Sequence, residues 1–473
     1  MTAAERTTSY PDHRPGFYEL GQSLAAVWDV WLSAQAGAEH VQRLGRYRLQ
    51  ELVAFAREHA PFYRELYRGI PPEGYRITDL PVVRKSRLME QFDAAVTDGR
   101  LTSALVRRFL ADERRAGHPL LDRYAVWTSS GTTGEPGVFV HDGRALAVYE
   151  ALQAVRFRRL ASPALFAAAL LRDDRYALVA ATGGHFDGNA TAERLRLLHP
   201  WLAERVRVFS VLEPVATLAQ RLNAYQPTLM ATYPTAASLL AEEQRAGRLA
   251  VQPREIWTGG EGLSCAQRTQ IAETFGCDVR EDYGASEFMA IAWDCGHDGA
   301  LHLNADWVAL EPVDVHYRPV PPGVASHTVL LTNLANRIQP LIRYDLGDSV
   351  TLLDRPCECG SRLPAIRVEG RCDEVLALSD ASGRAVKLLP LALTTVLEDE
   401  AGVHRFQLVQ VGAAALVLRL DPDAADAAPR CRRALGRFLK AQGLPDVRVE
   451  IEKTALRRHP VSGKLQRVVA LKG

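Results

Sequence analysis

Residues 128–137 contain the densest group of side chains in this sequence that could bind an anion. They run Thr-Ser-Ser-Gly-Thr-Thr-Gly-Glu-Pro-Gly, with three glycines and five hydroxyl residues in ten positions. Glycines let backbone N–H groups approach an anion closely and the hydroxyls add donors, so the composition suits a polyphosphate. The Gly-Lys-Ser/Thr ending of the P-loop is missing, and a Ser/Gly-rich hairpin turn is an equally good interpretation.

Four later segments combine charged residues with glycine or a tight turn. They are residues 282–287 (DYGASE), 343–348 (RYDLGD), 370–374 (GRCDE) and 460–467 (PVSGKLQR). Each segment alone could be a solvated turn. Their order and spacing along the chain carry the information.

In this order the five segments resemble the motifs of the adenylate-forming enzymes, and within them those of the phenylacetate–CoA ligase and coenzyme F390 synthetase branch. That family has a Ser/Thr/Gly phosphate loop, a Tyr-Gly-x-Ser/Thr-Glu motif, a ribose-binding Asp, a hinge after Gly-Arg and a late Gly-Lys. Residues 60–64 (APFYR) and 80–85 (LPVVRK) also look like this branch, so the resemblance covers about residues 45–473. It implies ATP-dependent activation of a carboxylic acid to an acyl-adenylate with release of pyrophosphate, followed by transfer to CoA as a thioester.

The resemblance implies roles in ATP binding for individual residues. Tyr283 would lie against adenine, Asp348 would accept both ribose hydroxyls, and Arg371 would contact ribose or phosphate beside the hinge. The phosphate loop would wrap the β- and γ-phosphates with Ser129, Ser130, Gly131, Thr132, Thr133 and Gly134. The remaining members of the ATP- and AMP-binding set are Gly260, Glu261, Asp282, Gly284 and Ser286.

Two residues are implied to act on the reaction itself. Glu287 would hold Mg²⁺, which neutralises the phosphates and assists the leaving pyrophosphate. Lys464 would reach from the C-terminal domain to the carboxylate and the α-phosphate, where charge builds during attack. Relatives usually carry Lys after the second Thr-Gly of the loop, whereas this chain has Glu135. That departure puts the strength of the loop's hold on the β- and γ-phosphates in question.

A cysteine and histidine group between residues 295 and 359 has the composition of a zinc site. Cys295, Cys357 and Cys359 offer three thiolates, and one imidazole would complete a tetrahedral set. His302 sits at alternating spacing in an expected strand while His297 lies in the turn, and we favour His302 with His297 as the alternative. The competing interpretation is a set of buried cysteines. With every position filled by protein, the zinc would be structural and would hold two loops near the Glu287 motif.

The acid pocket of this family lies between the sheet strands and the Tyr-Gly motif. Small residues beside aromatic ones favour a flat ring, so we expect an aryl or arylacetic acid. The candidate lining residues are Tyr233, Pro234, Gly259, Ala285 and Phe288. The acceptor is expected to be CoA; an amine or a carrier protein, as in specialised metabolism, is the alternative. A zinc-stabilised nucleotide-binding protein without catalysis is the rival class, and an intact Glu287 and Lys464 argue against it.

The chain around these motifs is predicted to be α/β. The first 115 residues favour helices, and apolar runs at 175–182, 206–212, 228–233 and 255–258 alternate with helical segments, which predicts parallel sheets covered by helices. One of these helices has a capping-box start at Ser264 and a glycine stop at Gly276. Strands dominate from about residue 300. We expect an N-terminal ATP- and acid-binding domain over 1–369, including a strand-rich subdomain, and a small mobile α+β domain over 370–473 that carries the late Lys.

Composition limits the partners and the compartment. The 473 residues contain 57 Lys plus Arg and 56 Asp plus Glu, a net charge of +1, so nucleic acid and anionic membranes are not expected as partners. No apolar run approaches the roughly 20 residues of a membrane span, and the N-terminus lacks an apolar signal segment. Seven cysteines do not make a disulfide scaffold, which favours the reducing cytoplasm. Homodimers are common in the family that this sequence resembles.

Overall fold

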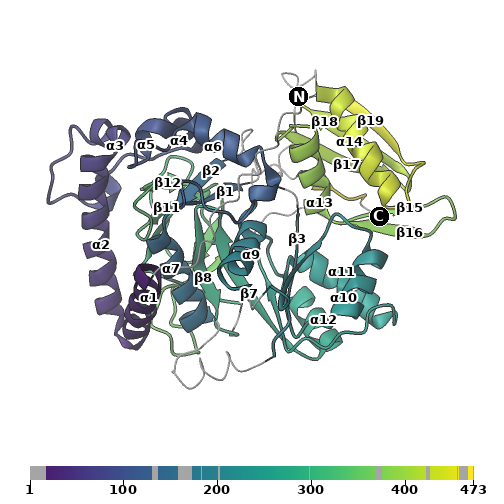
Figure 1. Ribbon diagram of the computed structural model, residues 1–473, viewed down its shortest axis with the longest axis horizontal. Helices are drawn as coiled ribbons and strands as arrows, with labels where there is room; N and C mark the ends of the chain where they lie inside the picture. The colour runs from purple at the N-terminus through teal and green to yellow at the C-terminus, as the bar shows by residue number, and fades with distance from the viewer. Residues whose placement is uncertain are drawn as a thin grey trace, which may run out of the picture.

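Residues 17–110 form a layer of helices at the left and along the top of the molecule as drawn in Figure 1. The computed structural model describes residues 17–129, 137–157, 173–182, 184–200, 203–297, 299–368, 375–421, 427–454, 456 and 467–471. The helices of this layer are α1 (Phe17–Gln35), α2 (Ala38–His59), α3 (Pro61–Leu66), α4 (Lys85–Glu90), α5 (Phe92–Ala95) and α6 (Ser103–Leu110). The prediction that the first 115 residues are mostly helical is therefore confirmed from residue 17 onward.

A nine-stranded sheet forms the centre of the fold, in the order β13-β14-β9-β8-β7-β6-β5-β3-β4. Its parallel half is β3 (Tyr176–Ala180), β4 (Val206–Ser210), β5 (Leu229–Thr232), β6 (Glu255–Thr258) and β7 (Asp278–Ala285). The first four of these strands arise from the apolar runs that predicted them. The helices that alternate with these strands are α9 (Asp187–Leu198), α10 (Val215–Tyr225), α11 (Pro234–Arg245) and α12 (Cys265–Phe275).

Helix α12 begins and ends as its sequence predicts. The Ser264 side chain accepts from the Gln267 N–H and the Gln267 side chain accepts from the Ser264 N–H, which closes the capping box. Gly276 ends the helix with φ +63°, a left-handed conformation that glycine adopts without strain. These two local signals fix where the chain turns back into β7.

The antiparallel half of the same sheet consists of β8 (Phe288–Asp294), β9 (Leu301–Leu303), β13 (Val350–Leu352) and β14 (Ala365–Val368). A separate sheet joins β10 (Val308–Val313), β11 (Thr328–Asn333) and β12 (Tyr344–Asp345). The hairpin of β1 (Ala125–Ser129) and β2 (Gly137–His141) leads into α7 (Gly143–Leu152) and a π-helical turn, η3 (Gln153–Phe157). The strand-rich region is present, although three of its strands extend the central sheet rather than forming a sheet apart.

The C-terminal elements gather at one corner of the molecule, in yellow-green in Figure 1. A four-stranded sheet, β19-β18-β17-β20, comprises β17 (Phe406–Gly412), β18 (Ala415–Leu420), β19 (Arg448–Lys453) and β20 (Val468–Val469). The other elements are β15 (Leu376–Ser379), β16 (Ala385–Leu388), α13 (Pro390–Thr395), η5 (Val396–Glu400) and α14 (Ala428–Ala441).

Two polar contacts join these C-terminal elements to the rest of the protein. Lys387 pairs with Glu242 of α11 at 2.6 Å, and Gln442 donates to the Leu212 carbonyl at 2.7 Å. The domain boundary near residue 370 lies outside the described residues and stays a prediction.

A buried charge network ties α2 and η3 to the loop between β9 and β10. Asp306 is fully buried and accepts from both guanidinium nitrogens of Arg156 at 2.7 and 2.8 Å, while Arg48 donates to the Asp306 carbonyl at 2.8 Å. Although burial disfavours the charged carboxylate, the two arginines hold the pKa of Asp306 below its usual range. The network therefore depends on one acidic side chain.

Replacing Asp306 with alanine is expected to lower the free energy of unfolding by about 3–5 kcal/mol, because the Arg156 charge would stay buried without its partner. The urea midpoint checks this result. Asp29→Ala is the matched control: Asp29 pairs with the same Arg48 but is more than a third exposed, so its loss is expected to cost at most about 1 kcal/mol. Equal losses in the two variants would contradict the prediction.

Candidate functional site

The tight hairpin between β7 and β8 brings together the residues predicted for adenine and ribose. Tyr283, near the end of β7, donates from its hydroxyl to Asp348 Oδ2 at 3.1 Å. Gly284 passes close to β8, because a Cβ built there would lie 2.3 Å from the Met289 carbonyl oxygen. Only glycine fits at that point without moving the backbone. Two motifs separated by more than 60 residues therefore meet in one place.

Glu287 lies in the same hairpin turn and is buried with a mixed set of charges around it. Burial raises the pKa of Glu287 to about 7; the Lys85 ammonium opposes that rise and the nearby Asp348 carboxylate adds to it. The Tyr344 hydroxyl also faces the Glu287 carboxyl. A carboxylate kept from water beside a second carboxylate is stabilised by a bound divalent cation, and its oxygens are ligands that Mg²⁺ accepts.

Lys85 stands at the base of the predicted phosphate loop. Its Nζ donates to Ser129 Oγ at 3.1 Å, and the same oxygen accepts from the Gly137 N–H at 3.2 Å. Ser129 and Gly137 form the last rung of the β1–β2 ladder, so this contact sits where the loop begins and ends. Ser130, Gly131, Thr132, Thr133, Gly134 and Glu135 lie outside the described residues. The sequence motifs assign no role to Lys85, although it is a cation in a segment that resembles the family, and the phosphate loop lacks its own lysine.

The ends of β5 and β6 supply the residues predicted around the acid and the adenine. Glu261 Oε2 accepts from the backbone N–H and the hydroxyl of Thr235 at 3.1 and 2.7 Å. Gly260 has φ +76°, and a Cβ there would lie 3.2 Å from the Tyr233 ring. Gly259 lies against β7, because a Cβ there would be 3.0 Å from the Asp282 carbonyl oxygen. The loops that follow β5 and β6 therefore lie at the same end of the sheet as Tyr283 on β7.

The remaining predicted residues of this edge differ in their surroundings. Pro234 begins α11, and Ala285 pairs across the hairpin with Phe288. Phe288 is fully buried, with its ring centre 4.8 Å from that of Tyr149, so its contact with an acid stays a prediction.

Two carboxylates lie near the turn between β7 and β8. Ser286 Oγ lies 3.4 Å from the Asp187 carboxylate. Burial raises the pKa of Asp282 to about 7, and Glu281 and Asp187 add to that rise.

Arg371 and Lys464 complete the predicted set, and both lie outside the part of the chain that the structure describes. Their roles therefore stay predictions. Arg467, three residues after Lys464, is described: its backbone carbonyl accepts from the Leu408 N–H at 2.7 Å and its guanidinium pairs with the buried Glu398. The segment that carries Lys464 thus ends at a fixed point.

The four residues predicted to bind zinc converge. One ligand atom from each of Cys295, His302, Cys357 and Cys359 lies within 4.8 Å of the others. The Cys295 and Cys357 sulfurs lie 3.5 Å apart, and His302 Nε2 lies 3.2 Å from Cys359 Sγ. Three cysteines and one histidine that converge in this way are the ligand types and number of a structural zinc site.

The structure distinguishes the two candidate histidines. His302 Nδ1 lies 3.1 Å from the Leu363 carbonyl oxygen, so it donates there and leaves the Nε2 lone pair facing the sulfurs. His297 Nδ1 instead lies 3.2 Å from the Cys295 carbonyl oxygen. The preferred ligand is therefore the one that the fold brings into the cluster.

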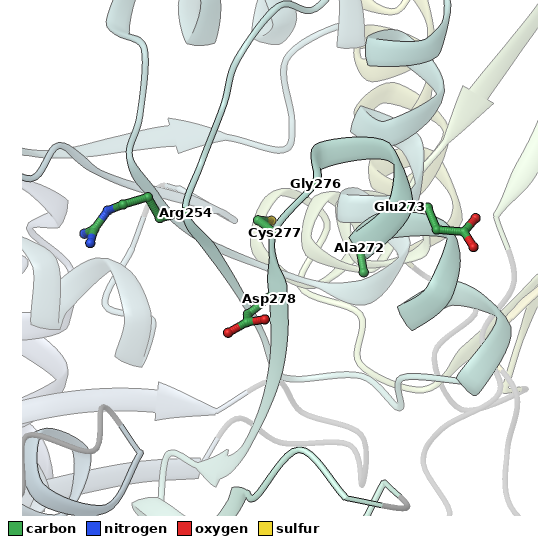
Figure 2. Close-up of a pocket in the computed structure, with 6 residues that line it drawn as sticks. All are labelled: Arg254, Ala272, Glu273, Gly276, Cys277 and Asp278. Carbon is green, nitrogen blue, oxygen red and sulfur yellow. The ribbon is translucent and has the colours of Figure 1, made fainter.

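A surface hollow lies at the other end of β7 (Figure 2). It is lined by Arg254, Ala272, Glu273, Gly276, Cys277 and Asp278. Burial raises the pKa of the Cys277 thiol to about 12, so the sulfur stays protonated at neutral pH and is a poor nucleophile. Because Asp278 begins the strand and Tyr283 stands near its end, this hollow is not part of the site described above.

The fold is that of the adenylate-forming CoA ligases. A structure of 2-hydroxyisobutyryl-CoA ligase with its adenylate and CoA in the thioesterification state has a TM-score of 0.55 and 23% identity, over 92% of this chain and 91% of the other. An open conformation of that ligase has a TM-score of 0.51 and 22% identity, over 91% of each chain.

Comparison of sequences identifies a more specific relative. A phenylacetate-coenzyme A ligase of Thermus thermophilus is 27% identical over 378 residues, which span 76% of this chain and 75% of that protein. Protein CapK of Staphylococcus aureus is 27% identical over 135 residues, or 28% of each chain. No protein-family model matches the sequence. The predicted resemblance to the adenylate-forming superfamily and to its phenylacetate–CoA ligase branch is confirmed by the first relative and the shared fold.

Proposed function

We propose that this protein activates a carboxylic acid with ATP and transfers the acyl group to CoA. A carboxylate oxygen attacks the α-phosphorus, the bond to the bridging oxygen of the β-phosphate breaks, and pyrophosphate leaves. The CoA thiol then attacks the acyl carbon and AMP departs. The convergence of Tyr283, Asp348 and Glu287 beside the phosphate-loop base carries this proposal, and the phenylacetate-coenzyme A ligase relative supports it.

The described residues divide the work in a way that fits this reaction. Tyr283 and Asp348 would hold adenine and ribose, and their 3.1 Å hydrogen bond fixes the two side chains relative to one another. Glu287 would hold Mg²⁺, which when bound neutralises phosphate charge. Residues at the ends of β5 and β6, among them Tyr233 and Gly259, would receive the acid, which we propose to be aryl or arylacetic.

Pyrophosphate release with a panel of aryl, arylacetic and fatty acids, each with and without CoA, tests the function. Release with an aryl acid that rises when CoA is added would support the full proposal. Pyrophosphate release that is the same with and without CoA would point to an amine or a carrier protein as the acceptor. No release with any acid of the panel would contradict the proposal.

The proposal extends to a structural zinc ion held by Cys295, His302, Cys357 and Cys359. Four protein ligands leave no open coordination position, so the ion would stabilise the fold and take no part in the chemistry. The cytoplasmic location and the homodimer also stay predictions. Within the described ranges, no helix is both long enough and apolar enough to cross a membrane.

Lys85 is expected to contribute to the binding of the ATP phosphates. Its ammonium lies at the loop base and near Glu287, so Lys85→Met should raise the KM for ATP about tenfold or more, the effect of losing a charged hydrogen bond. Steady-state kinetics with varied ATP checks this. Arg87→Met, on the exposed side of the same helix, is the matched control and should leave the KM unchanged. An unchanged KM in Lys85→Met would contradict the assigned contact.

A further inference from the structure

The Glu287 turn receives hydrogen bonds from side chains of distant elements. Residues Ser286 and Glu287 connect β7 to β8, and Ala285 pairs with Phe288 directly across them. The Ser286 carbonyl lies 3.0 Å from His141 Nε2, and the Glu287 carbonyl accepts from Asn333 Nδ2 at 2.9 Å. His141 is the last residue of β2 and Asn333 the last of β11, and both are fully buried.

A third side chain links the two donors and fixes where their protons lie. The Asn333 Nδ2 group also donates to the Tyr149 hydroxyl at 2.8 Å, so that hydroxyl donates its own proton to His141 Nδ1, 3.1 Å away. His141 Nε2 therefore carries the hydrogen that meets the Ser286 carbonyl. Asn333 cannot turn over, because its Oδ1 accepts from the backbone N–H groups of Ala335 and Asn336 at 3.0 and 3.1 Å.

This arrangement is closed to water and keeps one protonation state. The His141 ring lies 4.2 Å from the Trp127 ring, and burial lowers the pKa of His141 to about 3. The neutral imidazole is therefore the form of His141 present near neutral pH. The buried carbonyls of Ser286 and Glu287 have donors, which hold the two peptide planes on either side of the Glu287 Cα and so fix the direction of its Cα–Cβ bond.

We propose that His141, Tyr149 and Asn333 are positioning residues that aim the Glu287 carboxyl toward Lys85 and Asp348. This rests on the proposed function, in which Glu287 binds Mg²⁺ with ATP. The three residues touch neither substrate nor metal; they act through the backbone of the turn. Their effect should therefore appear in the part of ATP binding that depends on Mg²⁺.

Calorimetric titration of ATP with and without Mg²⁺ tests the proposal in the full-length protein. His141→Phe keeps an aromatic ring and loses the donor, so the dissociation constant for ATP with Mg²⁺ should rise about tenfold, while the value without Mg²⁺ stays near that of the wild type. His141→Gln, whose amide N–H replaces the donor, should restore most of the lost affinity. Tyr149→Phe removes the hydroxyl that donates to His141 Nδ1 and should give a smaller loss of about threefold, which also tests the proposal if His141→Phe does not fold.

Gln339 provides the matched control for a purely structural effect. It is equally buried and clamps β2 by accepting from Val140 N and donating to the Val138 carbonyl, at 2.7 and 3.1 Å. Gln339→Leu should lower the midpoint of thermal unfolding and leave the gain from Mg²⁺ unchanged. A His141→Phe protein that is destabilised but keeps the full gain from Mg²⁺ would overturn the proposal. Wild-type protein that gains ATP affinity from Mg²⁺ but activates no acid would overturn the proposed function alone.

Discussion

Replacing Lys464 with alanine is expected to slow pyrophosphate release by about 10²–10³-fold, while the affinity for ATP stays nearly the same. Negative charge builds on the α-phosphate as the carboxylate attacks, and a lysine held there stabilises the transition state more than the bound substrates. A single positioned donor of this kind contributes about 3–4 kcal/mol to the barrier. Release assays at saturating ATP and acid measure the rate, and calorimetry measures the ATP affinity.

The described residues on either side of Lys464 have defined partners. The chain leaves β19 at Lys453 and is fixed again at Arg467 by the hydrogen bond from Leu408 N and by the buried pair with Glu398. Lys453→Ala is the control, because it removes the same charge from an exposed position on the near side of the segment. Normal release in Lys464→Ala would remove the lysine from the mechanism, and equal losses in the two variants would point to a general effect of charge.

Much of the fold could be predicted because its signals are local. The apolar run at residues 228–233 gave β5, and the Ser264 cap with the Gly276 stop gave α12. The membership of each sheet could not be predicted in the same way. Strands β9, β13 and β14 join the central sheet through pairs such as Ala365 with His302, more than 60 residues apart. Composition does not encode such non-local pairing.

The site, like the fold, combines residues that carry local sequence signals with residues that only non-local contacts bring together. Glu287, Tyr283 and Asp348 carry motif signals, and the structure brings them together. Lys85, His141 and Asn333 come from three other segments and meet the site only through the tertiary fold. A buried histidine or asparagine has no sequence signature when its partner is a backbone carbonyl. Lys85 lies in a segment that resembles the family, but its contact with the Ser129 hydroxyl follows only from the tertiary fold. The choice of His302 over His297 followed from strand alternation, a local pattern that the sequence does contain.

Purified protein prepared without chelator is expected to contain about one zinc ion per chain, and Cys359→Ser is expected to lose it. Elemental analysis measures the metal. Cys265→Ser is the matched control: Cys265 is exposed at the start of α12, so its loss should leave the zinc content unchanged. Zinc-free wild-type protein would contradict the proposed zinc site. Full zinc content in Cys359→Ser would show that Cys359 is not a required ligand.

Loss of the ion is also expected to lower the midpoint of thermal unfolding by about 10 °C. Structural zinc contributes folding free energy directly, and a loss of about 4 kcal/mol in a large domain corresponds to a shift of this size. The ion would join the turn after β8 to the Cys357–Cys359 turn, where the buried cluster of Cys295, Ala300 and Ala365 is small and is packed only against partly buried hydrophobic residues among those described. Scanning calorimetry before and after chelation measures the shift.

The consequence of zinc loss should extend to ATP binding through Asp294. This buried residue precedes Cys295; it accepts from Gly296 N at 2.6 Å and from Glu281 N at 3.1 Å, and it pairs with Arg268 at 2.6 Å. It therefore connects the zinc turn to β7, the strand that carries Tyr283. Chelated protein below its unfolding midpoint is expected to bind ATP more weakly, and unchanged affinity after complete zinc removal would show that the two sites are independent.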